Sequence, residues 1–172
     1  MELESLPGSP DPSTNKALMT AADDSEPTPR RCRPGKKNKD GLPFVACEGT
    51  PYLSLDYHQS SSGTRHQKSI WSLTRPDECH TFCESRLNAW ADSDGNYWSV
   101  AAEKSEDFGT RGQRMAFFPV PTNETDTWHG YPIGRKNEQS DPHDPPTDLV
   151  QLWRDQGRIS RMTRARIIQR QL

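Results

Sequence analysis

Aromatic residues are absent from the first quarter of this chain. All 14 of them (five Trp, four Tyr and five Phe) lie at or after Phe44 in a sequence of 172 residues. Residues 1–43 also hold seven of the 15 prolines. A segment without aromatic side chains buries too little apolar surface to offset the entropy that is lost on ordering. The sequence therefore predicts a disordered polar leader over residues 1–43. About 130 residues remain to form one modest core.

Six Lys and Arg residues form a basic cluster between Arg30 and Lys39 in this leader. Such a cluster is compatible with a nucleic-acid contact or a nuclear address. Short basic runs are weak motifs, so a solvated linker is the favoured interpretation. The whole chain has a formal net charge of -2, which argues against a globally basic nucleic-acid binder.

The sequence shows neither a membrane span nor a secretory signal. No stretch approaches the roughly 18 apolar residues that cross a bilayer. The N-terminus carries Glu2 and Glu4 where a secretory signal has a basic start and an apolar run. We therefore expect a soluble cytoplasmic protein whose four cysteines are mostly reduced.

Residues 44–146 have the pattern of an aromatic-rich α+β core. The alternation of Tyr52–Tyr57 has the period of a half-buried strand. Pro76 is followed by two acidic residues, which suit the first turn of a helix. Gly95 can adopt the positive φ that a turn at 92–96 requires. The expected elements are one helix, Pro76–Trp90, and four main strands, Phe44–Cys47, Tyr52–Tyr57, Tyr97–Ala102 and Met115–Val120.

Residues 147–172 have the pattern of a C-terminal helical hairpin. Thr147 and Ser160 are good N-cap residues, and Gly157 can end the first helix in a left-handed conformation. We expect this hairpin to pack on the core. The predicted fold class is α+β: a small antiparallel sheet with one packed helix and a C-terminal helical hairpin, preceded by the disordered leader.

The cysteines do not form a recognisable metal motif. Cys79 and Cys83 are four residues apart and share one face of the predicted helix. Structural zinc sites usually contain closely spaced ligand pairs on loops, and Cys32 falls in the leader. A zinc site would have to recruit Cys47 or a histidine. We therefore interpret Cys79 and Cys83 as small core side chains and expect no metal ligand.

The segment Trp128–Pro132 (Trp-His-Gly-Tyr-Pro) has the most unusual local composition. Trp128 and Tyr131 could form the walls of a pocket, and His129 could act there as a general acid or base near neutral pH. The alternative is that both aromatic rings are buried and His129 bonds to a backbone carbonyl. We favour this structural interpretation slightly.

A charged excursion, residues 103–114, separates the last two predicted strands. Glu103 lies just past the first strand, and Arg111 and Arg114 precede the second. A carboxylate, an arginine and a histidine suit acid–base cleavage of a phosphodiester. This chemistry requires Glu103 and Arg114 to converge with His129, which the sequence does not demand. A solvated hairpin loop is the simpler interpretation.

The second C-terminal helix is rich in arginine. Its Arg161 and Arg164 follow a glycine-containing turn, so the pair of helices has the outline of a helix-turn-helix. A DNA-reading motif normally needs a third helix to complete its core, and none is evident. Docking on the sheet, or a contact with a partner, is the favoured alternative.

These features favour a small cytoplasmic binding or regulatory module that recognises a macromolecular partner or an anionic ligand. The expected recognition residues are Arg111, Trp128 and Tyr131, because aromatic and arginine side chains are enriched at binding hot spots. One alternative is a metal-independent nuclease or phosphodiesterase that uses His129 and Glu103. The other is a DNA-binding protein that uses the C-terminal helices. We expect no cofactor, since phosphate-loop, dinucleotide and zinc-protease motifs are missing. The expected partner is a protein or a nucleic acid.

Overall fold

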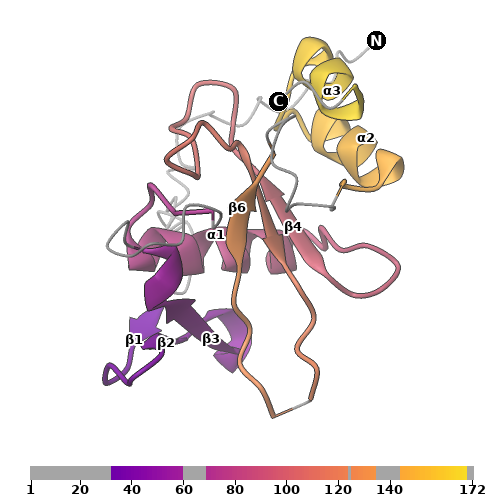
Figure 1. The fold of residues 1–172 in the computed structure, drawn as a ribbon. Coiled ribbons are helices and arrows are strands. Elements are labelled where there is room, and N and C mark those ends of the chain that lie inside the picture. Colours follow the sequence, from indigo (N-terminus) through magenta and orange to yellow (C-terminus); the bar gives the residue numbers. More distant parts are fainter. Residues whose placement is uncertain (1–31, 60–68, 124, 135–143, 170–172) are drawn as a thin grey trace, which may run out of the picture.

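A computed structural model describes residues 32–59, 69–123, 125–134 and 144–169. It contains two antiparallel sheets of three strands each and three α-helices (Figure 1). The first sheet has the order β1 (Arg33–Pro34), β2 (Gly41–Val45), β3 (Pro51–Leu55). The second has the order β4 (Tyr97–Val100), β5 (Met115–Phe118), β6 (Tyr131–Ile133). The helices are α1 (Arg75–Leu87), α2 (Thr147–Asp155) and α3 (Arg161–Ile168).

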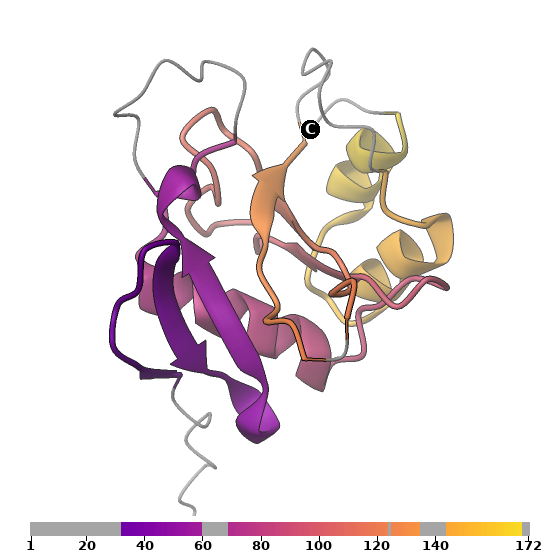
Figure 2. The same ribbon diagram turned by 60° about the horizontal axis from the view of Figure 1, so that its bottom comes forward.

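This arrangement confirms the predicted α+β class, with the strands divided between two sheets. Short 3₁₀ turns, η1 (Cys47–Gly49) and η2 (Asp56–His58), flank β3. The two views agree that the first sheet and the pair α2–α3 lie at opposite ends of the molecule (Figures 1 and 2). Among the helices that the structure describes, none is long and apolar enough to cross a membrane.

The folded part begins earlier than the sequence predicts. The sequence predicts residues 32–43 as part of the leader, but they form β1, the start of β2 and the loop between them, whereas residues 1–31 lie outside the described residues. Arg33 pairs with Val45, and Gly41 pairs with Leu55. A Cβ at Gly41 would collide with the carbonyl of Ser54, so the close strand approach requires glycine there. Hydrogen bonds between main chains order this segment, and the number of aromatic residues in a segment does not indicate such pairing.

Helix α1 forms where the sequence predicts it but ends three residues earlier. The Thr74 side chain caps its first turn by accepting a hydrogen bond from the Asp77 amide at 3.4 Å. After Leu87 the chain turns at Ala89, which has a φ of 53°. The amide of Trp90 then bonds back to the Ser85 carbonyl at 2.8 Å. This left-handed residue ends the helix, so Trp90 enters a different core from the α1 side chains.

The second sheet separates two hydrophobic cores. Along β5, Met115 and Phe117 face one core while Ala116 and Phe118 face the other, as the strand period of two requires. The first core lies between this sheet, the first sheet and α1, and it includes Phe44, Tyr52, Trp71, Phe82 and all four cysteines. The second core lies beneath the helical hairpin and includes Trp90, Trp98, Val100, Ile133, Val150, Trp153, Ile159 and Ile167.

Helices α2 and α3 pack on the second core as a hairpin. Gly157 between them has a φ of 71°, and the Ser160 side chain caps α3 by accepting from the Thr163 amide at 3.1 Å. Arg158 joins the hairpin to the rest of the chain. Its guanidinium lies 2.7 Å from the carboxylate of Glu84 and donates to the Val100 carbonyl at 2.9 Å.

Candidate binding cavity and the predicted site residues

Glu103 caps a helix in this structure. Its carboxylate accepts a hydrogen bond from the Ser160 amide at 2.5 Å, at the N-terminus of α3. Hydrogen bonds from Thr163 and Ser160 lower the pKa of Glu103 to about 2. A carboxylate at this position also complements the positive end of the helix dipole. Glu103 is therefore held in its ionised form by the α3 N-terminus.

Arg114 closes the base of the charged excursion. Its guanidinium lies 3.1 Å from the Asp107 carboxylate and donates to the carbonyls of Ala101 and Ala102 at 3.4 and 2.5 Å. The backbone amide of Arg111, nearer the tip, donates to Oε1 of Gln113 at 3.0 Å. These contacts order the excursion as a structured loop on the end of the second sheet.

The Trp128–Pro132 segment joins the two sheets. The Trp128 carbonyl accepts from the Leu53 amide at 2.7 Å, and its own amide donates to the Pro51 carbonyl at 3.1 Å. The half-buried Trp128 ring packs on Phe82 and Tyr97, with ring centroids 5.3 and 5.2 Å away. Trp128 therefore mainly links β3 to the segment that leads into β6.

His129 and its two expected partners lie at opposite ends of the second sheet. Glu103 follows Val100 and Arg114 precedes Met115, and these two strand ends pair with each other. His129 precedes Tyr131, which pairs with Phe117 toward the other end of β5. Four strand residues span roughly 10 Å, which exceeds the reach of a hydrogen bond. The structure thus brings Glu103 and Arg114 together and leaves His129 apart; burial lowers the pKa of the His129 imidazole.

The arginines of α3 lie on the outside of the hairpin. Arg161 is exposed and Arg164 is half-buried, while Ile167 faces the second core. Met162 and Ile168 on the same helix are also exposed, at 64% and 44% of their surface. The exposed side of α3 therefore mixes arginine with apolar side chains.

A cavity of about 510 Å³, open to solvent, lies beside the second sheet. It lies where the 92–96 turn, strands β4 to β6 and the entry to α2 meet. Tyr131, predicted as a binding residue, is part of its wall. Its lining consists of Asp92, Ser93, Asp94, Asn96, Trp98, Phe117, Pro119, Tyr131, Asp144 and Pro146. We call this the acidic–aromatic cavity.

Three neighbouring aromatic rings form one side of the cavity, with Phe117 between Trp98 and Tyr131. The ring of Phe117 lies 4.6 Å from that of Trp98 and 5.8 Å from that of Tyr131. Each ring comes from a different strand of the second sheet, so the sheet itself fixes their spacing. Trp98 and Phe117 are buried in the second core, with 2% and 4% of their surface exposed, so the half-buried Tyr131 is the most accessible of the three rings.

Aspartates supply the polar part of the lining. Asp92 accepts hydrogen bonds from the amides of Asp94 and Asn96 at 3.0 Å each and from the Trp98 indole at 2.9 Å. Partial burial raises the pKa of Asp92, but hydrogen bonds from Asn96 and Trp98 outweigh it and lower the pKa overall. Asp92 is therefore a fixed negative charge. Asp94 and Asp144 add two exposed carboxylates, and the lining contains neither lysine nor arginine among the described residues.

Sequence reasoning identified one wall of this cavity and missed the rest. It predicted the 92–96 turn, and Gly95 has the expected positive φ of 85°. The sequence analysis gives no role to Asp92, Asp94 or Trp98. Two aspartates at alternate positions just before a strand that begins with Tyr-Trp could have indicated an acidic and aromatic site. Asp144 is about 50 residues away along the chain, and only the fold brings it to the same place.

The structure also corrects the interpretation of the cysteines. Cys79 and Cys83 are buried on α1 as predicted, but Cys79 forms a disulfide with Cys32. The expectation of reduced cysteines, with Cys32 in the disordered leader, is therefore wrong for this pair. Comparison of the chain with known protein families, with curated proteins and with solved structures gave no match.

Proposed function

We propose that this protein is a cytoplasmic binding module that recognises a lysine or arginine side chain of a protein partner in the acidic–aromatic cavity. The observation that carries the proposal is the combination of Asp92, Asp94 and Asp144 with the rings of Trp98, Phe117 and Tyr131 in one cavity. Carboxylates attract a cation, and aromatic rings stabilise it by about 0.5–2 kcal/mol, depending on how far it is desolvated.

The size and construction of the cavity support this choice of ligand. A volume of about 510 Å³ lies within the range of pockets that enclose a small ligand or a long side chain. Asp92 is held by four hydrogen-bond donors, so the negative charge is positioned before a ligand arrives. Preorganisation of this kind lowers the entropy lost on binding.

The proposal keeps the binding-module hypothesis and changes the charge of the expected ligand. Binding of an anionic ligand would require that the arginines of the 103–114 excursion face a common site. Arg114 instead bonds to Asp107 and to backbone carbonyls, away from the Trp128–Pro132 segment. The cavity beside Tyr131 is negative, so it favours a cation.

Isothermal calorimetry with short peptides tests the proposal. A lysine–glycine peptide and an arginine–glycine peptide should bind, and a glutamate–glycine peptide of equal length should not. Binding should weaken with added salt, because the attraction is partly electrostatic. Equal heats for the basic and acidic peptides, or binding of duplex DNA in preference to either basic peptide, would contradict the proposal and favour an arginine-based surface.

A pair of matched variants locates the site. Asp94→Asn removes a carboxylate of the cavity, and we expect about a fivefold loss of affinity, the range of an exposed ion pair. Glu106→Gln removes the same charge from the excursion at the other end of the sheet and should leave the affinity unchanged. An equal effect of both variants would mean that only net charge matters.

A further inference from the structure

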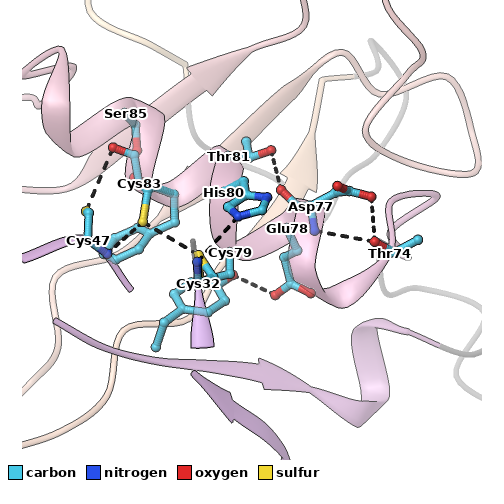
Figure 3. Close-up of a disulfide and its surroundings, with 12 residues drawn as sticks. Cys32, Cys47, Thr74, Asp77, Glu78, Cys79, His80, Thr81, Cys83 and Ser85 are labelled. Carbon is cyan, nitrogen blue, oxygen red and sulfur yellow. Dashed lines mark hydrogen bonds between the residues drawn. A yellow bond between two sulfur atoms is a disulfide. The ribbon is translucent and has the colours of Figure 1, made fainter. Parts of the chain in front are cut away.

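Three of the four cysteines converge in the first core, and the fourth, Cys47, lies beside them. The sulfur atoms of Cys32, Cys79 and Cys83 lie within 4.8 Å of one another, and all three residues are buried. Cys32 precedes β1, whereas Cys79 and Cys83 occupy successive turns of α1 (Figure 3). Cys47, in η1, lies against the same group. The disulfide uses only Cys32 and Cys79, so it accounts for half of this convergence.

The surroundings of the sulfurs match those of a thiolate–metal centre. The Cys47 amide donates a hydrogen bond to Cys83 Sγ at 2.8 Å. Backbone donors of this kind are outer contacts that orient sulfur ligands. A tetrahedral zinc site with Zn–S bonds of about 2.3 Å places its sulfurs about 3.8 Å apart. Cys83 Sγ and Cys32 Sγ are 3.7 Å apart here.

We propose that, in the reduced protein, Cys32, Cys79, Cys83 and Cys47 bind a thiophilic divalent ion of the zinc class. Cys47 is assigned as the fourth ligand because it is the remaining buried thiol beside Cys83; its Sγ donates here to the Cys83 carbonyl at 3.9 Å and would turn from that oxygen to the ion. His80 is exposed, and its Nε2 accepts instead from the Cys32 amide at 3.4 Å. The ion would tie the segment before β1, η1 and α1 together.

The metal and the disulfide exclude each other. A thiol reductant transfers two electrons to the Cys32–Cys79 bond, which gives two thiols and leaves the reductant as a disulfide. Binding of the ion then releases one proton from each ligand thiol to solvent.

The test uses the full chain, reduced without oxygen and then titrated with Co²⁺ and with Zn²⁺. We expect one Co²⁺ per chain with the intense near-ultraviolet thiolate absorption of a tetrahedral sulfur site, and its displacement by Zn²⁺. We also expect Zn²⁺ to protect all four thiols from alkylation and to raise the Tm of the reduced chain. Less than a tenth of an equivalent bound, or no protection of the thiols, would overturn the proposal.

Three variants separate the metal site from a purely structural disulfide. Cys83→Ser leaves the Cys32–Cys79 disulfide intact, so a disulfide alone predicts no change in Co²⁺ absorption, whereas the metal site predicts loss of binding by at least tenfold. Cys47→Ser should weaken binding similarly, while His80→Asn, the matched neighbour, should not. Retained binding in Cys83→Ser would overturn the metal site, and a loss with His80→Asn alone would overturn the assignment of Cys47.

Discussion

The two faces of the second sheet are stabilised by different physical interactions. The face toward α1 covers a first core that contains four cysteines and the buried carboxylate of Glu78. The face toward α2 and α3 covers a second core of tryptophan and aliphatic side chains. Redox state and pH near neutrality therefore act on the first core, whereas the second core is stabilised mainly by apolar packing.

Glu78 is the clearest sign of this difference. It is fully buried and accepts hydrogen bonds from Tyr52 at 2.6 Å, Ser54 at 2.7 Å and Gln59 at 2.6 Å. Burial raises the pKa of its carboxyl to about 7, although these three donors and Arg75 lower it in part. The carboxylate and its donors join α1 to β3 and to the segment after it. A buried acid of this kind makes the junction sensitive to pH near neutrality.

The largest expected effect is on packing in the second core. Trp153 is fully buried, and its ring packs edge-on against Trp90 at 6.1 Å. Trp153→Ala should lower the free energy of unfolding by about 3–5 kcal/mol, because a large cavity remains. Leu152→Ala, one residue earlier on α2 and 37% exposed, is the control and should lose far less. Urea unfolding at pH 7 measures both; equal losses would show that α2 does not pack on this core.

The next effect concerns pH and the first core. Because the folded-state pKa of Glu78 is raised to about 7, from an ordinary value of 4.5, its contribution is fully present below pH 4.5. It is lost as the pH rises through 7, by about 3 kcal/mol in total. Glu78→Gln should flatten the fall in unfolding free energy between pH 5 and 8. The exposed residue Glu106 provides the control substitution, Glu106→Gln, which should keep the wild-type slope; an unchanged slope in Glu78→Gln would refute the assignment.

The smallest effect has the opposite pH dependence and lies at the hairpin. Glu103 has a pKa lowered to about 2 by its hydrogen bonds with Thr163 and Ser160. Its contribution is therefore present above its ordinary pKa of 4.5 and is lost as the pH falls toward 2. Glu103→Gln should lower stability at pH 7 by about 0.3–1 kcal/mol. Thermal unfolding at pH 3 and pH 7 tests this sign, since the variant should differ less from wild type at pH 3.

Local patterns explain which parts of the fold could be predicted. The N-terminal proline and acidic residues of α1, and the glycine between α2 and α3, act through backbone geometry within a few residues. The alternation of β3 reports burial on one face. These features are encoded locally, so the sequence predicts α1, β3 and the two hairpin helices with errors of a few residues at their ends, whereas it does not predict β1 or β6.

The other features depend on contacts between distant segments. Residues 32–43 are ordered by main-chain pairing with β3 through β2 and by the Cys32 cross-link to α1, neither of which leaves an apolar pattern. The acidic–aromatic cavity needs Asp94 and Asp144 in one place. Glu103 was predicted as a catalytic residue because its type and position fit, but its partner is the α3 N-terminus, which lies 57 residues away in the chain.

We propose that a cationic partner binds in the acidic–aromatic cavity, on the second-core face of the sheet, and not at the first core. Amide chemical-shift mapping of the ¹⁵N-labelled chain with the lysine–glycine peptide tests this location. We expect saturable shifts for Asp92–Trp98, Phe117, Tyr131 and Asp144, with the amides of β1 to β3 unchanged. Shifts confined to the 103–114 excursion or to α3, or no shifts at millimolar peptide, would contradict it.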